Sequence, residues 1–171
     1  DGTTQPGAAL AASHSDIMDD SGMKQITINV APRPYEARIE AGVLARAGEE
    51  LSALIPASSR VFVITNPVVR AKWGATLEKS LTEAKVKCEF LEVPDGERSK
   101  NMATIENLTG RLLKAGADRG SVLVAFGGGV IGDLTGFLAS IFMRGIPVVQ
   151  LPTTLLAQVD ASIGGKTGVN L

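Results

Sequence analysis

A glycine-rich turn after an apolar stretch is the sequence feature with the clearest chemical meaning. Residues 122–126 read VLVAF, a β-branched and apolar run that is typical of a strand buried on both faces. The run leads directly into GGGVIGD and then into an apolar helical pattern. A strand, a glycine turn and a helix start together point backbone N–H groups towards an anion. The sequence therefore predicts a nucleotide or phosphate site, with the candidate residues Gly128, Gly129, Val130, Ile131, Gly132 and Asp133.

The same turn matches a dinucleotide-binding pattern only in part. Gly127, Gly129 and Gly132 satisfy GxGxxG, but the acidic residue expected about 20 residues later is missing at the end of VVQLP. An ordinary Rossmann fingerprint is therefore not supported. Asp133 is expected in the first turn of the helix, where the helix dipole favours a carboxylate and where it could also hold a ligand hydroxyl.

A second polar motif, DGERSK, lies between a predicted strand and a predicted helix. It offers two carboxylates, a hydroxyl and a cation, which suit ribose hydroxyls and a phosphate. The alternative is a solvated turn in which Ser99 caps the next helix. The candidate residues here are Asp95, Gly96, Glu97, Arg98, Ser99 and Lys100.

Three further groups complete the candidate chemistry. Thr153 and Thr154 follow a strand, so that one hydroxyl can cap the next helix while the other stays free. Asp160 and Lys166 bracket DASIGGK, and a lysine in a glycine-rich loop commonly meets a phosphate or carboxylate. GGKTG is not a Walker A loop, because the first glycine is missing at the required spacing. Arg144 stands between apolar segments, where it is either a surface residue or a partner for an anion or a second subunit.

The surrounding pattern predicts an α/β fold that brings these groups together. Alternating segments near residues 26–30 and 35–41, separated by prolines, indicate an antiparallel hairpin at a sheet edge. Beyond them, strands alternate with helices, which predicts a Rossmann-like, mostly parallel sheet with helices on both faces. Asn66 and Pro67 form a good N-cap and first-turn pair for one helix. Ligands bind such sheets at the carboxyl ends of the strands, so Asn66 and the loops 94–100, 127–133 and 152–154 should form one rim.

Composition limits the class of protein. The chain has 171 residues, 44% of them hydrophobic, which suits one α/β domain, and 17 basic against 18 acidic residues leave no basic surface for nucleic acid. No apolar run reaches the ~20 residues that span a bilayer, and the single cysteine, Cys88, fits a reducing, cytoplasmic compartment. We interpret residues 1–22 as a disordered extension or tag before a native start at Met23, with the only histidine, His14, solvated inside it.

In this order, DGERSK, GGGVIGDLTGF, FMRG and LPTTLLAQVDASIGGKTGVN closely resemble the 3-dehydroquinate synthase family of the sugar-phosphate cyclase superfamily. The resemblance covers essentially residues 23–171. It implies an enzyme that uses NAD and a divalent metal (zinc or cobalt) to convert 3-deoxy-arabino-heptulosonate 7-phosphate to 3-dehydroquinate and phosphate. It also implies a homodimer when the protein is full length, and no nucleic-acid or membrane partner.

The resemblance also implies residue roles. It assigns Asp160 and Lys166 to the substrate end of the site, and it suggests that Arg144 reaches the substrate phosphate of the neighbouring subunit. The NAD contacts that it implies, some of them through the motifs as a whole, are Asn66, Asp95, Gly96, Glu97, Arg98, Ser99, Lys100, Gly128, Gly129, Val130, Ile131, Gly132, Asp133, Thr153, Thr154 and Lys166.

One departure from the family is large. Its members carry a second, mostly helical domain with a glutamate and two histidines on the metal, and this sequence stops at GVNL before any of it. We therefore expect residues 23–171 to be an NAD-binding α/β domain without metal ligands, folded but inactive alone. The alternatives are another sugar-phosphate cyclase such as 2-deoxy-scyllo-inosose synthase, a glycerol dehydrogenase-like oxidoreductase, or a bare nucleotide-binding module.

Overall fold

The computed structural model describes residues 17–18, 24–29 and 34–170 and divides into two units, residues 1–41 and 42–171. The first unit contains the strands β1 (Ile17–Met18), β2 (Lys24–Ile28) and β3 (Tyr35–Ile39). β2 pairs with both neighbours in antiparallel register, and Ile26 lies opposite Ala37. The predicted hairpin is thus confirmed, but it belongs to a sheet separate from the parallel one rather than to that sheet's edge. His14 and Met23 lie outside the described residues.

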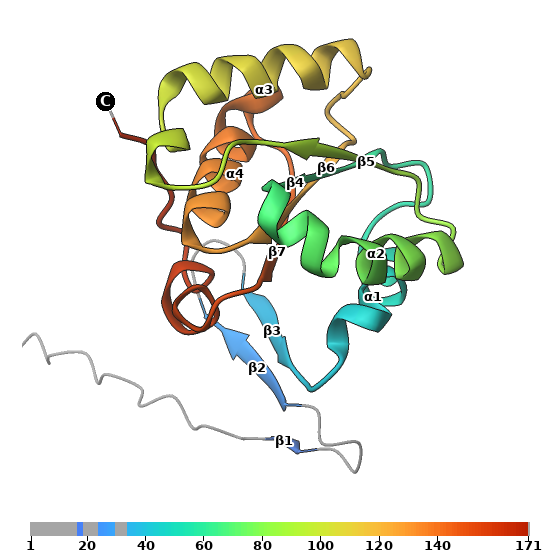
Figure 1. Cartoon of the computed structure of the whole chain (residues 1–171). Helices are drawn as coiled ribbons and strands as arrows, with labels where there is room; N and C mark the ends of the chain where they lie inside the picture. The colour runs from blue at the N-terminus through green and yellow to red at the C-terminus, as the bar shows by residue number, and fades with distance from the viewer. Residues whose placement is uncertain (1–16, 19–23, 30–33, 171) are drawn as a thin grey trace, which may run out of the picture. The chain divides into compact units, whose positions relative to one another are not determined.

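The second unit is built on a parallel sheet (Figure 1), whose strands are β4 (Val61–Thr65), β5 (Cys88–Glu92), β6 (Val122–Gly127) and β7 (Val148–Pro152). They lie in the order β5-β4-β6-β7, and every neighbouring pair is parallel. The helices between and around them are η1 (Val43–Arg46), α1 (Ala47–Leu54), α2 (Pro67–Glu83), η2 (Glu97–Ser99), α3 (Met102–Lys114), α4 (Gly129–Ile141), η3 (Phe142–Arg144) and η4 (Ala157–Ala161).

Helices cover both faces of this sheet, as the apolar strands require. Successive residues of β4 alternate between two clusters, with Phe62 and Ile64 in one and Val61 and Val63 in the other. The first cluster contains the buried side chains of α3 and α4, and the second contains those of α1 and α2. A strand buried on both faces has no polar position, which explains the continuous apolar run of VLVAF.

The parallel register places the carboxyl ends of the strands at one edge. Thr65 pairs with Glu92, and Gly127 pairs with Pro152, so each strand ends beside the end of its neighbour. The loops that follow these ends carry most of the predicted site residues. The α/β architecture predicted from the sequence is therefore confirmed, and these loops lie at the edge where such sheets bind ligands.

Cys88 begins the edge strand β5 and is half-buried against the cluster formed with α1 and α2. Burial raises the pKa of its thiol above the ordinary value of 9.0, and the charge of Glu78 raises the pKa further. The thiol therefore acts as a packing group.

Candidate functional site

The glycine turn leaves the amino end of α4 open. α4 begins immediately after β6, and its N-cap residue, Gly128, contributes no side-chain hydrogen bond to the helix. Among the described residues, the N–H groups of the first turn therefore have no side-chain acceptor, and the helix dipole adds a partial positive charge there. Gly127 has a different role, because a Cβ on it would lie 2.6 Å from Cγ1 of Ile131. That glycine lets the helix approach the strand.

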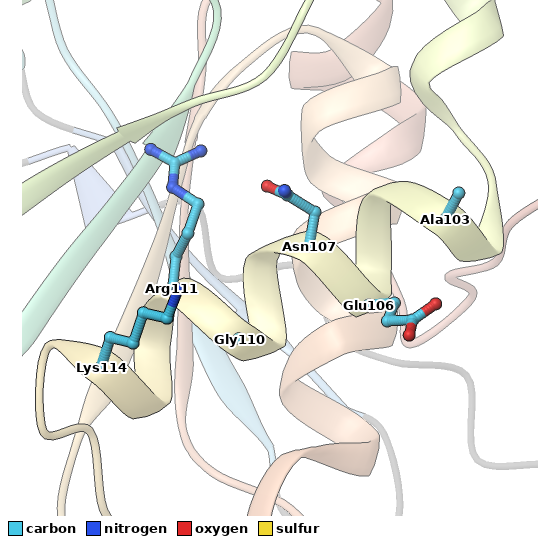
Figure 2. Close-up of a pocket in the computed structure, with 6 residues that line it drawn as sticks. All are labelled: Ala103, Glu106, Asn107, Gly110, Arg111 and Lys114. Carbon is cyan, nitrogen blue, oxygen red and sulfur yellow. The ribbon is translucent and has the colours of Figure 1, made fainter.

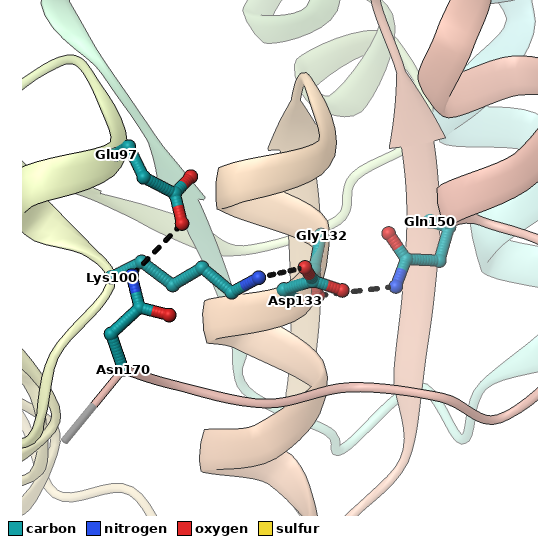
Figure 3. A network of polar contacts seen from close by, with 6 residues as sticks. All are labelled: Glu97, Lys100, Gly132, Asp133, Gln150 and Asn170. Carbon is teal, nitrogen blue, oxygen red and sulfur yellow. Dashed lines mark hydrogen bonds and ion pairs between the residues drawn. The ribbon is translucent and has the colours of Figure 1, made fainter.

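Asp133 does not lie in the first helical turn, which contains no acidic residue. It is the fifth residue of α4, so the expected dipole interaction is wrong. Its Oδ2 atom instead accepts from Nζ of Lys100 at 2.5 Å, and the two side chains are only 23% and 19% exposed (Figure 3). This ion pair joins the turn 95–100 to α4. The sequence predicted both residues for the site but not their contact.

Asn66 caps α2 as predicted and also joins two loops of the rim. Its Oδ1 atom accepts from the N–H of Val69 at 2.8 Å, and Pro67 follows at the first helical position. Its Nδ2 atom donates to Oδ1 of Asp95 at 2.6 Å. The second Asp95 oxygen makes no hydrogen bond in the described part of the chain, which leaves an acceptor for a ligand hydroxyl.

Ser99 does not cap α3, contrary to the sequence-based expectation. It is buried at the end of η2, and its hydroxyl donates to the carbonyl oxygen of Pro94 at 2.6 Å. The cap is Asn101, whose Oδ1 accepts from the N–H of Thr104 at 2.9 Å. The short helix η2 moves the start of α3 two residues further along the chain than the sequence pattern suggested.

These assignments predict different effects at two neighbouring positions. Asn101→Ala should lower the free energy of unfolding by about 1 kcal/mol, the usual cost of losing an N-cap, and should speed hydrogen exchange of the Thr104 amide. Ser99→Ala should leave that amide unchanged, because its hydroxyl bonds elsewhere. Exchange measured by NMR on both variants checks this, and faster exchange at Thr104 in the Ser99 variant alone would contradict it.

The two threonines after β7 divide their roles as predicted. The hydroxyl of Thr154 accepts from the N–H of Ala157 at 3.2 Å and so caps the helical turn that follows. The hydroxyl of Thr153 is buried and has no hydrogen-bond partner among the described residues, while its N–H donates to Gly127 at 2.9 Å. A buried hydroxyl without a partner costs roughly 1–3 kcal/mol. A ligand that accepts or donates there would recover that cost.

The remaining predicted residues lie at different distances from the glycine turn. Asp160 lies in η4, and a Cβ on Gly129 would touch the neighbouring Ala161 at 3.5 Å, so this segment lies beside the glycine turn. Asp160 and Lys166 are exposed, and their side chains make no polar contact with the described residues. Arg144 lies beyond the opposite end of the 13-residue α4. At a rise of ~1.5 Å per residue this is roughly 20 Å from the turn, so Arg144 is not part of the rim.

Two site residues were missed from the sequence. Nδ2 of Asn170 donates to Oε1 of Glu97 at 2.9 Å, and its N–H donates to the carbonyl oxygen of Lys100 at 2.8 Å (Figure 3). Gln150 places its Nε2 atom 3.4 Å from the carbonyl oxygen of Gly132. Neither contact has a local signal, because each joins residues far apart in the sequence.

Other features of the described residues do not compete with the rim. An open hollow along the exposed side of α3 contains no rim residue (Figure 2); its lining is Ala103, Glu106, Asn107, Gly110, Arg111 and Lys114. No three histidine, cysteine or acidic side chains within residues 17–18, 24–29 and 34–170 gather as a metal site requires. In the same ranges, none of the helices has the length and apolar character needed to cross a bilayer.

Comparison with known proteins agrees with this geometry. The 3-dehydroquinate synthase N-terminal family model matches residues 90–171. The chain is 49% identical to the 3-dehydroquinate synthase of Koribacter versatilis, over 87% of this chain and 41% of that protein. It is 47% identical to the 3-dehydroquinate synthase of Solibacter usitatus, over 87% of this chain and 40% of that protein.

A solved structure shares the fold. The crystal structure of 2-deoxy-scyllo-inosose synthase complexed with carbaglucose-6-phosphate, NAD+ and Co2+ superposes with a TM-score of 0.76 at 28% identity, covering 86% of this chain and 40% of that one. The fold and the rim therefore define a Rossmann-like α/β domain of the sugar-phosphate cyclase kind. More narrowly, the family model and the relatives above are 3-dehydroquinate synthases, which this chain resembles, and it spans about two fifths of the length of those relatives.

Proposed function

We propose that this chain is the NAD-binding part of a 3-dehydroquinate synthase, with residues 23–171 as the NAD-binding domain. One observation carries the proposal. Loops that follow the ends of β4, β5, β6 and β7 supply an open helix start, free carboxylate oxygens, a lysine and an unpartnered buried hydroxyl at one edge of the sheet. These are the groups that a dinucleotide requires.

The residues fit the parts of NAD. The N–H groups at Gly129 and the following residues would bind the pyrophosphate, because no side chain competes for them. Asp95 and Glu97 each have one carboxylate oxygen without a hydrogen-bond partner among the described residues, and these would accept ribose hydroxyls. The orphaned hydroxyl of Thr153 would regain a hydrogen bond. Asp133 would hold Lys100 within the site.

The proposed overall reaction is the conversion of 3-deoxy-arabino-heptulosonate 7-phosphate to 3-dehydroquinate with release of phosphate. NAD supplies a hydride acceptor that is regenerated within the cycle. Asp160 and Lys166 would act at the substrate end, where an exposed lysine neutralises negative charge. The divalent metal that the family implies is not assigned to the described residues, which offer no suitable cluster.

The assembly is also part of the proposal. Arg144 lies at the end of α4 that is far from the rim, which supports a role towards the substrate phosphate of a neighbouring subunit in a homodimer. A cytoplasmic location rests on the single cysteine of the chain.

Higher sequence identity to 3-dehydroquinate synthases favours this reaction over those of the alternative enzymes. The synthases above are 47–49% identical to the chain, whereas the 2-deoxy-scyllo-inosose synthase structure is 28% identical. A longer protein that contains this segment should release phosphate from the heptulosonate phosphate without accumulating NADH. Net NADH would instead indicate a dehydrogenase, and turnover of another sugar phosphate would indicate a different cyclase.

Calorimetric titration of NAD tests the cofactor proposal. We expect saturable binding to the parent chain. Lys100→Ala and Asp133→Ala should each weaken it at least about tenfold, because each leaves a partly buried charge unpaired.

Lys114→Ala and Glu106→Ala are the matched controls, since both side chains are exposed on α3 (Figure 2) and should leave the affinity unchanged. Absence of saturable binding to the parent chain, or equal losses in the α3 controls, would contradict the proposal.

A further inference from the structure

The segment 167–170 lies across α4 and ends on the turn 95–100. A Cβ on Gly136 would lie within van der Waals overlap of Thr167, so the segment passes directly over the glycine. Val169 packs against the cluster of α3 and α4 side chains. Asn170 then forms an isolated parallel bridge with Asn101. The Thr167 side chain therefore packs on α4 at one end of this segment, and the Asn170 backbone is bonded to the turn at the other.

Asn170 makes two contacts with the turn. Its N–H donates to the carbonyl oxygen of Lys100, and its Nδ2 donates to Oε1 of Glu97 (Figure 3). Lys100 in turn is paired with Asp133 of α4. Contacts from Asn170 thus fix both the backbone that carries Lys100 and the carboxylate of Glu97, and they leave the second Glu97 oxygen available.

From this geometry we propose that Asn170 is a positioning residue of the dinucleotide site. This inference rests on the proposed function. Its amide holds Glu97 in the orientation that accepts a ribose hydroxyl. Asn170 acts through Glu97 and Lys100 rather than on the ligand. An amide donates a hydrogen bond where a carboxylate cannot, so this role requires a hydrogen-bond donor at position 170.

Substitution at Asn170 tests the donor requirement. Asn170→Ala should weaken NAD binding by about threefold to tenfold, the range expected for one partly exposed hydrogen bond. Asn170→Asp keeps the shape but places a second carboxylate against Glu97. Its loss should exceed that of Asn170→Ala, because two carboxylates then face each other and neither can donate a hydrogen bond.

A ligand-free readout and a matched control accompany the titrations. In the absence of NAD, both Asn170 variants should speed hydrogen exchange of the Lys100 and Asn101 amides, whose bonds close the turn. Asn107→Ala should change neither exchange nor affinity, because Asn107 is exposed on α3 (Figure 2). In an E97Q background, N170D should cost little, since the glutamine amide can donate to the new carboxylate.

The outcomes separate the two claims. Normal NAD binding and unchanged exchange in the Asn170 variants would overturn the positioning role and leave the proposed function intact. Faster exchange together with a loss of affinity in N170D that the E97Q background does not relieve would make Asn170 a structural tether only, which also overturns it. If the parent chain does not bind NAD, the proposed function and this inference fail together.

Discussion

Replacing Gly128 with aspartate is expected to abolish NAD binding while the fold is retained. Gly128 is the N-cap of α4 with φ −79° and ψ −169°, a conformation open to any residue. An aspartate there would accept the first-turn N–H groups and place a negative charge where the pyrophosphate belongs. Two charges ~4 Å apart at an effective dielectric constant of about 20 repel by about 4 kcal/mol. Solvent screening lowers this, and a loss of affinity of at least about 100-fold is expected.

The isosteric asparagine separates charge from shape. Gly128→Asn should also cap the helix but repel nothing, so it should bind NAD more tightly than the aspartate variant. Both substitutions should change the free energy of unfolding by less than about 0.5 kcal/mol, because the gain of a cap over glycine is only a few tenths. The Cβ that either substitution adds would lie 3.3 Å from Cγ2 of Thr154. Calorimetry and thermal unfolding check this, and equal affinities for both variants would show that no anion binds at this turn.

The largest loss of stability from one added methyl group is expected at Gly48. This residue lies in α1, and a Cβ on it would lie 2.2 Å from the carbonyl oxygen of Ser80 and 2.9 Å from Cα of Leu81, both backbone atoms of α2. Gly48→Ala would also strain the bond from its N–H to the Ser80 hydroxyl, now 2.9 Å. Overpacking should outweigh the ~1 kcal/mol that alanine gains in a helix and leave a net loss of about 2 kcal/mol or more.

Gly110 in α3 is the matched control. Nothing lies within 4 Å of a Cβ at this position, so Gly110→Ala should stabilise the chain by about 0.5–1 kcal/mol. The two alanine variants should therefore shift the unfolding midpoint in opposite directions, by roughly 2–4 °C for each kcal/mol. A midpoint that rises in the Gly48 variant would show that α1 and α2 are not packed as described.

The fold was predictable because its signals are local. VLVAF followed by glycines, and Asn66 followed by Pro67, each specify a strand, a turn or a helix start within a few residues. Parallel topology then brings the loops together without any further information. Prediction was wrong where two local solutions compete, since both Ser99 and Asn101 suit an N-cap, and Ser99 is excluded only because it is the last residue of η2.

The polar connections of the site could not be predicted in the same way. The Lys100–Asp133 and Asn170–Glu97 contacts join residues 33 and 73 positions apart, and no periodicity encodes such pairs. The roles of Arg144 and Lys166, which depend on a ligand or a second subunit, stay predictions.

Mapping NAD onto the chain by NMR tests the central claim most directly. Titration of NAD into the ¹⁵N-labelled chain should shift the amides of Gly128–Asp133, Asp95–Lys100 and Thr153–Thr154 in a saturable manner. The amides of residues 103–114, along the exposed hollow of α3, should shift much less. Saturable shifts confined to α3, or spread without any maximum at the glycine turn, would contradict the account of the rim as a dinucleotide site.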